Sequence, residues 1–339
     1  MSGAPKEISI SRDEMIEVAT EILIKAGTPT DKARSVAESL ISAQEAGHPS
    51  HGLIRLIEYV SFVKKGTVIP GADPKLISEH GAIASIDGNW GWGQVACKFA
   101  LTLIEERIAK FGTVTITVKN VNHIGRLGEY VERLAERGLV SMMWCNSDPS
   151  VAAFGGVERL FGTNPFAVGI PTGGEPIVID FATAASAEGK LRVARANGQQ
   201  VPKGMVIDKS GADSTDPNAF YEGGSLLPFG GHKGYCMSLM IELLGGALSG
   251  GHPAISKDYS RGNGTVLIAM DPKYFAGGAD FITDIDQSVA RISGTKPAKP
   301  DQPVLLPGQV ENMARSKNRN GIAVSEPIWQ SITELRASL

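Results

Sequence analysis

The sequence predicts a mixed α/β protein in which helices pack on a mixed sheet and a helical lobe comes first. Two observations predict this class. Up to about residue 65, apolar side chains recur at the three- and four-residue spacing of amphipathic helices. From about residue 82, apolar runs of strand length alternate with helical segments, which is the pattern of a sheet covered by helices. A chain of 339 residues is also long enough to bury a large core.

Three helices are expected before the first strand. Ser11 and Glu14 form a capping-box pattern that starts the first helix. Thr30 and Ser50 are the expected N-caps of the second and third helices, because a side-chain oxygen at such a position can accept from the free N–H groups of a helix start. The third helix is expected to continue to about Lys65.

The rest of the chain predicts the sheet. Strands are expected at 82–86, 113–118, 140–145, 166–170, 177–181 and 265–270. Helices are expected at 94–110, 128–137, 235–249 and 328–339. The Gly- and Pro-rich stretch 65–74 predicts a boundary. We therefore expect a helical lobe over residues 1–75 and a sheet domain over residues 76–304.

Composition argues against several classes of protein. The 33 Lys and Arg residues nearly balance the 36 Asp and Glu residues and form no basic block, so no nucleic-acid partner is expected. The first 14 residues lack the apolar core of a signal peptide, and the longest apolar stretch, 236–248, is too short to span a membrane. The three cysteines, which are Cys97, Cys145 and Cys236, lie apart in apolar runs. They predict reduced core residues of a cytoplasmic protein, and neither a disulfide frame nor a metal site.

The segment Ser50-His51-Gly52-Leu53-Ile54-Arg55 says most about function. At a spacing of four residues, His51 and Arg55 are expected on one face of a helix start. An imidazole titrates near neutral pH, and a guanidinium holds a carboxylate with two parallel hydrogen bonds. A proton donor beside a carboxylate clamp is what reduction of a 2-oxo acid to a 2-hydroxy acid requires. The alternative is a purely structural role, with Arg55 paired to Glu58 or Glu45.

Two glycine-rich helix starts are candidates for binding a nucleotide. Gly91-Trp92-Gly93-Gln94-Val95-Ala96 matches the Rossmann fingerprint, but the next strand ends without the acidic residue that binds a ribose hydroxyl. Phe229-Gly230-Gly231-His232-Lys233-Gly234 is the stronger candidate, because glycines, a cation and a helix N-terminus coincide there. Its alternative is an ordinary loop with a solvated lysine.

Two further segments lie at ends of predicted strands, where sites on α/β scaffolds commonly form. In 122–128, His123 is either a catalyst or a satisfied turn residue. In 180–186, Asp180 either binds a ribose hydroxyl or fixes the turn that follows it, and Thr183 or Ser186 alternatively caps a helix.

Together these segments resemble the type 2 malate/L-lactate dehydrogenase family of NAD(P)-dependent oxidoreductases. The matching pieces keep the family's order from about residue 10 to about residue 330. They are Ser50-His51-Gly52-x-x-Arg55, Asn122-His123-Ile124-Gly125, Gly162-Thr163-Asn164-Pro165, Asp180-x-Ala182-Thr183 and Gly230-Gly231-His232-Lys233-Gly234-Tyr235.

The resemblance implies a fold that composition does not show. Members form homodimers around a mixed, largely antiparallel sheet that is not a Rossmann fold, so the Gly91 fingerprint would be a decoy. Residues 305–339 would join the N-terminal helices in one lobe. Members transfer a hydride between NAD or NADP and small 2-oxo acids, and we expect NAD here with NADP as the alternative.

The resemblance also implies roles for individual residues. Arg55 would bind the substrate carboxylate, and either His51, oriented by Ser50, or His123 would be the proton donor. The substrate side would be lined by Thr163, Asn164 and Lys190. The cofactor would contact Gly125, Ser147, Asp180, Phe181, Ala182, Thr183, His232, Lys233, Gly308 and Gln309.

Two alternatives remain at this point. A branch of the family reduces cyclic imines, and there an aspartate ten residues after the Asp180 position completes a Ser–His–Asp relay. Here that position is Lys190, and a cation would repel a protonated imine, so we expect an oxo acid reductase. The other alternative is a small-molecule binder without turnover, against which the retained proton donors argue.

Overall fold

The structure is a computed structural model that describes residues 6–339. Its strands are β1 Glu7–Ile10, β2 Lys75–His80, β3 Ile83–Asp87, β4 Thr113–Val121, β5 Val140–Cys145, β6 Val151–Ala152, β7 Arg159–Phe161, β8 Pro165–Ile170, β9 Ile177–Ala182, β10 Val206–Ile207, β11 Asp213–Ser214, β12 Ser225–Leu226, β13 Asn263–Met270 and β14 Ile322–Ser325. Its α-helices are α1 Arg12–Lys25, α2 Thr30–Glu45, α3 Arg55–Lys64, α4 Gly93–Phe111, α5 Gly128–Ala135, α6 Glu188–Ala196, α7 Asn218–Tyr221, α8 His232–Ile241, α9 Phe281–Ser293, α10 Gln309–Lys317 and α11 Glu326–Ser338. Two 3-10 helices, η1 Pro49–His51 and η3 Pro272–Tyr274, and one π-helix, η2 Glu242–Leu248, complete the elements.

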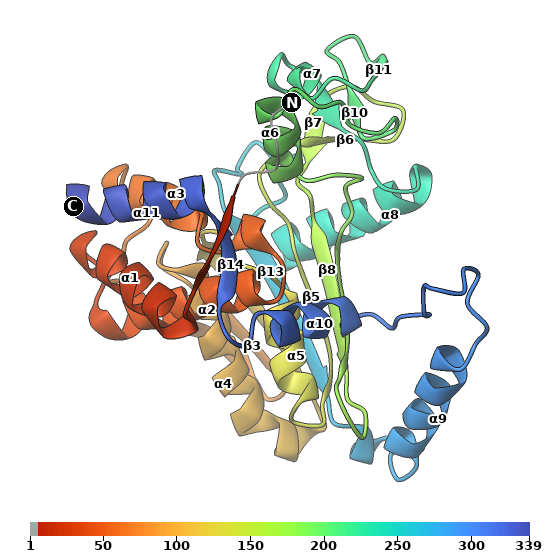
Figure 1. Ribbon diagram of the computed structural model, residues 1–339. Helices are drawn as coiled ribbons and strands as arrows, with labels where there is room; N and C mark the ends of the chain where they lie inside the picture. Colours follow the sequence, from red (N-terminus) through yellow and green to blue (C-terminus); the bar gives the residue numbers. More distant parts are fainter. Residues whose placement is uncertain (1–5) are drawn as a thin grey trace.

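A seven-stranded sheet forms the centre of the molecule, with strand order β2-β3-β4-β13-β5-β8-β9 (Figure 1). Of its described neighbouring pairs, β3 and β4 alone run parallel, and α4 makes the connection between them. The mixed, largely antiparallel sheet flanked by helices is therefore confirmed, and the doubly wound parallel sheet of a Rossmann fold is absent from the described chain.

Helices cover both faces of this sheet. Along β13, Leu267 belongs to the core under α4 and α5. The preceding residue, Val266, packs with Ile241 of α8 on the other face of the sheet. This alternation follows from the two-residue period of a strand. The expected strands were all found, but β2 on the sheet edge was missed because its residues are exposed and carry no apolar alternation.

The chain termini come together in a second core. Helices α1, α2 and α3 pack with α11, and β1 pairs antiparallel with β14. In Figure 1 the red and orange N-terminal helices accordingly lie beside the blue C-terminal helix. The limits of the two expected domains, at 75/76 and 304/305, stay a prediction.

A small five-stranded sheet, β11-β10-β12-β6-β7, lies at one end of the molecule with α6 and α7 (Figure 1). The sequence analysis missed it, because its strands are two or three residues long and too short to show a period.

Two of the expected N-caps are wrong. Ser11 is confirmed, since its Oγ accepts from Glu14 N at 3.1 Å. Thr30 is instead the first residue of α2, after Pro29, and makes no cap. Ser50 lies inside η1, and α3 begins only at Arg55. The chain leaves the helical path at Gly52 because the backbone packs directly on α2: a Cβ on Gly52 would lie 2.3 Å from Gln44 Oε1.

The apolar run 236–248 also differs from expectation. The helix begins at His232, three residues early, and continues as the π-helix η2. Cys97 and Cys145 are buried, but Cys236 is exposed on α8. One side of α8 and η2 faces outward, so an apolar run there does not imply burial.

Candidate active site

Two histidines from distant segments form the centre of the candidate site. His51 ends η1 and His123 follows β4, and their rings stack with centroids 5.4 Å apart. Ser50 Oγ and His51 Nδ1 are 3.1 Å apart. The structure thus brings together the two candidate proton donors, which are 72 residues apart in the chain.

The start of α4 holds His123 in place. A Cβ on Gly93 would lie 2.6 Å from Asn122 O and 2.7 Å from His123 O, so only glycine lets α4 pack this closely on the segment. Asn122 Nδ2 in turn donates to Trp90 O at 3.1 Å. Gly93 of the Gly91 fingerprint therefore packs the start of α4 against the histidine segment.

Tyr59 contacts His123 from the buried side, and Gln94 contacts Tyr59 in turn. Tyr59 Oη lies 2.8 Å from His123 Nδ1 and accepts from Gln94 Nε2 at 2.7 Å. Tyr59 is 1% exposed and Gln94 is 0% exposed. The sequence analysis missed both. Tyr59 carried a signal, because it follows Arg55 by four residues and so lies one helical turn further on.

Arg55 lies at the edge of the histidine pair. Its Nε donates to Ser50 O at 2.7 Å, and its Nη1 is 2.5 Å from Glu58 Oε2. Arg192 of α6 approaches the other Glu58 oxygen at 3.5 Å. The Arg55–Glu58 pair that a structural role predicts is thus present. The bonds to Ser50 and Glu58 engage Nε and Nη1 of Arg55 and do not involve Nη2.

Burial makes both imidazoles neutral. It lowers the pKa of His51 to about 3, with a further contribution from the Arg55 charge. Burial also holds the pKa of His123 well below its usual value, and Arg55 and His51 add to this. Without a bound anion, the pair can accept a proton but carries no charge near pH 7.

Helix α6 passes the histidines on the exposed side. The Cβ position of Gly189 is 3.6 Å from Ser50 Cβ. Lys190, the next residue, is exposed. Tyr221 Oη donates to Glu188 Oε1 at 3.0 Å, which attaches the start of α6 to the small sheet.

Two of the residues expected on the substrate side, Thr163 and Asn164, belong to an internal network. Ser147 Oγ accepts from Thr163 N at 3.1 Å, and Thr183 Oγ1 donates to Thr163 O at 3.1 Å. Asn164 is completely buried, and its Nδ2 donates to Glu242 Oε2 of η2 at 2.9 Å. The amide of Asn164 therefore faces the interior and orders the backbone at this point.

Three of the expected cofactor segments meet around the end of β9. Gly128 N donates to Asp180 Oδ2 at 2.8 Å, so the turn that Asp180 fixes is the start of α5 and not the one that follows it. Thr183 O accepts from Phe229 N at 2.9 Å, which places the second glycine-rich loop beside β9. Phe181 of β9 packs edge-on against Phe229, with centroids 5.7 Å apart.

Two helix starts beside β9 fit the phosphates of a dinucleotide. Gly230 and Gly231 have φ values of +56° and +63°, and α8 follows with His232 and Lys233 exposed at its first turn. Gly308, at φ +95°, precedes α10, where Gln309 Oε1 accepts from Leu306 N at 2.8 Å. A Cβ at Gly308 would lie 3.1 Å from Val178 N, so this backbone can lie close to β9 only with glycine there. Free N–H groups, positive dipole ends and a cation are the donors that a pyrophosphate needs.

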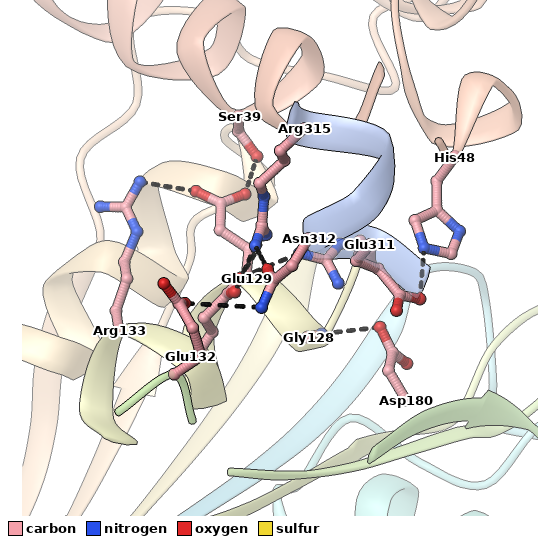
Figure 2. A network of polar contacts seen from close by, with 12 residues as sticks. Ser39, His48, Gly128, Glu129, Glu132, Arg133, Asp180, Glu311, Asn312 and Arg315 are labelled. Carbon is pink, nitrogen blue, oxygen red and sulfur yellow. Dashed lines mark hydrogen bonds and ion pairs between the residues drawn. The ribbon is translucent and has the colours of Figure 1, made fainter. Parts of the chain in front are cut away.

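Figure 2 shows how α10 is attached across this region. His48 Nε2 lies 3.1 Å from Glu311 Oε1, and Arg315 binds both oxygens of Glu132 at 2.6 Å. The sequence offered no signal for these pairs, because their partners are more than 180 residues apart. Gly125, also expected to contact the cofactor, has φ +82° and lies against Gln94 in the turn before α5.

Comparisons with known proteins agree with this architecture. The family model for malate/L-lactate dehydrogenase matches residues 10–333. An L-sulfolactate dehydrogenase of Methanocaldococcus jannaschii is 32% identical over 93% of this chain and 92% of that protein. A Delta(1)-pyrroline-2-carboxylate/Delta(1)-piperideine-2-carboxylate reductase of Pseudomonas syringae pv. tomato is 33% identical over 96% of both chains.

The fold has a solved counterpart as well. A putative malate/lactate dehydrogenase from E. coli superimposes with a TM-score of 0.93 at 33% identity, covering 98% of this chain and 95% of that one. No described helix has both the length and the hydropathy needed to cross a membrane. The family match over nearly the whole chain, together with these relatives, shows that this chain belongs to the malate/L-lactate dehydrogenase family and is an oxidoreductase of 2-hydroxy acids.

Proposed function

We propose that this enzyme transfers a hydride reversibly between a nicotinamide cofactor and C2 of a small 2-oxo or 2-hydroxy acid, with His51, Arg55 and His123 in contact with the substrate. The observation that carries the assignment of residues is the neutral, stacked histidine pair beside a guanidinium. A nicotinamide supplies or accepts the hydride when bound, and the protein contributes orientation and charge.

The substrate carboxylate would bind the Nη2 side of Arg55. Glu58 holds Nη1 and Ser50 O holds Nε, so the fork is oriented before substrate arrives. In the oxidation of a hydroxy acid, one neutral imidazole takes the hydroxyl proton. In the reverse direction, the proton donor gives its proton to the carbonyl oxygen. The bound carboxylate would offset the Arg55 contribution to the lowered pKa of both histidines, which is smaller than the contribution of burial.

The cofactor would lie between the starts of α8 and α10, along the end of β9. Ser147, Phe181, Ala182 and Thr183 would border it, and Lys233 would face its phosphates. We propose NAD as the cofactor, because the carboxylates nearest this region, Asp180 and Glu311, suit a ribose hydroxyl better than a 2′-phosphate. The ratio of kcat/KM for NADH and NADPH tests this choice.

The enzyme is proposed to work as a homodimer in the cytoplasm. Large apolar side chains are exposed in succession along α8 and η2, namely Met240, Leu243, Leu244 and Leu248. Such a stripe is typical of an interface. Leu244→Glu should convert a dimer to a monomer in light scattering, whereas Ile77→Glu on the exposed edge strand β2 should not.

The cytoplasmic location rests on three cysteines that form no disulfide.

Arg55→Lys tests the substrate site. Lysine keeps the charge but loses the planar fork, so the KM for the oxo acid should rise, while the KM for NADH stays nearly the same. Arg34→Lys is the matched control, because Arg34 also pairs with a glutamate on its own helix but lies on the surface of α2. An unchanged KM for the oxo acid in Arg55→Lys would leave Arg55 as a structural ion-pair residue only.

A cyclic imine reductase is the second candidate, because one relative at 33% identity carries that name. Against it stands Lys190, a cation on the helix that passes Ser50. A substrate panel of oxaloacetate, pyruvate, longer 2-oxo acids and pyrroline-2-carboxylate separates the two. Turnover of the imine alone would favour the reductase. No turnover at all, with ligand-induced stabilisation intact, would favour a non-catalytic binder.

A further inference from the structure

We propose that Tyr59 and Gln94 are positioning residues that fix His123 as the neutral tautomer with its hydrogen on Nε2. His123 is then a permanent hydrogen-bond donor to the substrate oxygen, and His51 is the group that gains and loses the proton. This division of roles rests on the proposed function, but the tautomer itself is a property of the free protein.

The direction of the hydrogen bonds follows from the donors available. Gln94 Nε2 donates to Tyr59 Oη, which has a single hydrogen of its own. That hydrogen is free to donate to His123 Nδ1, at 2.8 Å. Burial raises the pKa of Tyr59 to about 12, so the phenol keeps this hydrogen at neutral pH. A neutral imidazole that accepts at Nδ1 carries its hydrogen on Nε2.

The reversed chain is less favourable because of the type of group that it leaves unpaired. If the Gln94 amide were turned, its oxygen would accept from Tyr59, and Tyr59 would accept from Nδ1–H. The NH₂ group would then occupy the buried place of Oε1, which has no partner among the described residues. Two buried N–H hydrogens would then be unpaired, in place of one N–H hydrogen and one carbonyl oxygen. An orphaned buried N–H is the rarer condition in folded proteins.

His51 has a different environment from His123. Its Nδ1 neighbour is Ser50 Oγ at 3.1 Å, a hydroxyl that donates or accepts by rotating. Ser50 is exposed, and among the described residues its hydroxyl is hydrogen-bonded to His51 alone. His51 can therefore change its protonation state without breaking a buried chain, whereas protonation of His123 at Nδ1 would displace the Tyr59 hydrogen. The same Arg55 charge acts on both rings, so it does not distinguish them.

Long-range ¹H–¹⁵N NMR of histidine-labelled protein tests the tautomer directly, because it separates a protonated from an unprotonated ring nitrogen. The His123 signals are those missing from His123→Asn. We expect His123 in the full-length protein to show Nε2 protonated and Nδ1 unprotonated throughout pH 6–9. Tyr59→Phe keeps the ring in the core and removes the donor, so both tautomers should appear.

Two further variants keep the test decisive. Gln94→Met preserves the volume but frees the Tyr59 hydroxyl to accept from Nδ1–H, so it should also give a mixture, even where Tyr59→Phe folds poorly. Tyr274→Phe is the matched control, because its hydroxyl bonds a carbonyl at the far end of α4, and His123 should be unchanged there. A hydrogen on Nδ1 in the native protein, or a pure Nε2–H form in both variants, would overturn the proposal.

Kinetics separate this inference from the proposed function. With an active substrate, Tyr59→Phe should lower kcat about tenfold and leave the KM for NADH unchanged, since general acid–base groups contribute about 10²–10⁴-fold in all. If no 2-oxo acid in the panel is turned over but His123 is purely Nε2–H, the proposed function fails and the tautomer assignment stands.

Discussion

The two glycine-rich helix starts, at Gly93 and at Gly230 to Gly234, look alike in sequence and differ in what their glycines do. At Gly93 the missing Cβ makes room for carbonyl oxygens of the His123 segment, 2.6 and 2.7 Å from where it would be. At Gly230 nothing lies within 4 Å of the Cβ position, and the glycine is needed for its φ of +56°. One start is closed by protein, and the other is open to solvent.

A sequence fingerprint for a nucleotide site does not record whether the helix start is exposed or covered by protein. Both segments follow a strand or loop, contain spaced glycines and begin a helix, as a phosphate site requires. Only the second has exposed side chains with donors at its first turn, His232 and Lys233. At the first, Gly93 packs directly against the segment 122–124.

The largest effect is expected for Gly93→Ala. The added methyl would meet backbone atoms, which cannot move like a side chain, so we expect a loss of about 3 kcal/mol in the free energy of unfolding. We also expect kcat to fall about 10²-fold, because a shift of His123 misplaces a catalytic group. Urea denaturation and steady-state kinetics measure both quantities, and wild-type behaviour would contradict the close approach.

Gly234→Ala and Gly230→Ala form a matched pair at the second start. A Cβ on Gly234 would lie 2.1 Å from Phe229 O, so we expect about 2 kcal/mol of destabilisation by overpacking. At Gly230 only the left-handed backbone is strained, with about 1 kcal/mol expected. Thermal unfolding of the two variants should rank them in this order. Equal losses would mean that backbone strain alone decides at this loop.

Lys233→Ala should act on the cofactor and not on stability. The side chain is exposed, so its loss should leave the melting temperature unchanged. The KM for NADH should rise roughly tenfold, because a hydrogen bond to a charged group is worth about 1.5 kcal/mol or more. Lys75→Ala, on the exposed strand β2, is the control. If Lys75→Ala and Lys233→Ala gave the same KM for NADH, the phosphates of the cofactor would not bind at the start of α8.

A pH dependence of stability is expected from His51, whose ring stacks on that of His123 in the Gly93-supported segment. The pKa of His51 is lowered from 6.5 to about 3 in the folded protein by burial. Between these values the unfolded chain binds a proton that the folded chain does not, so stability is complete above pH 6.5 and falls as the pH falls toward 3. His51→Gln should flatten the fall in urea midpoint between pH 7 and pH 4. A parallel curve for the variant would refute this assignment.

Much of the central sheet could be read from sequence because its strands are long and buried. The strands β5, β9 and β13 each contain five apolar residues, and β4 alternates Val114, Ile116 and Val118 with threonines, as is typical of a covered sheet. The exposed strand β2 and the two-residue strands of the small sheet carry no such pattern. Amphipathic α9, which has no buried residue among those described, was missed although its apolar residues recur at helical spacing.

The candidate site could be predicted residue by residue but not as an arrangement. His51, Arg55 and His123 were recognised as chemistry-bearing residues, and their roles stay a prediction. Tyr59 and Gln94 were not recognised, because a buried tyrosine and glutamine in helices look like ordinary core and surface positions until their partners are known. The same holds for Glu242, whose buried carboxylate orders Asn146 and Asn164 from the far side of the sheet.

By itself the sequence determined the strands and helices with strong periodicity, the capped start of α1 and the types of residue able to hold a carboxylate, a proton and a phosphate. These are local properties, since propensity, spacing and side-chain chemistry act within a few residues. Tertiary structure alone decided that η1 ends at His51, that Gly93 supports a histidine and that Gly230 faces solvent. These depend on which distant backbone lies against each segment. Packing between residues far apart in the chain leaves no periodic trace in either partner.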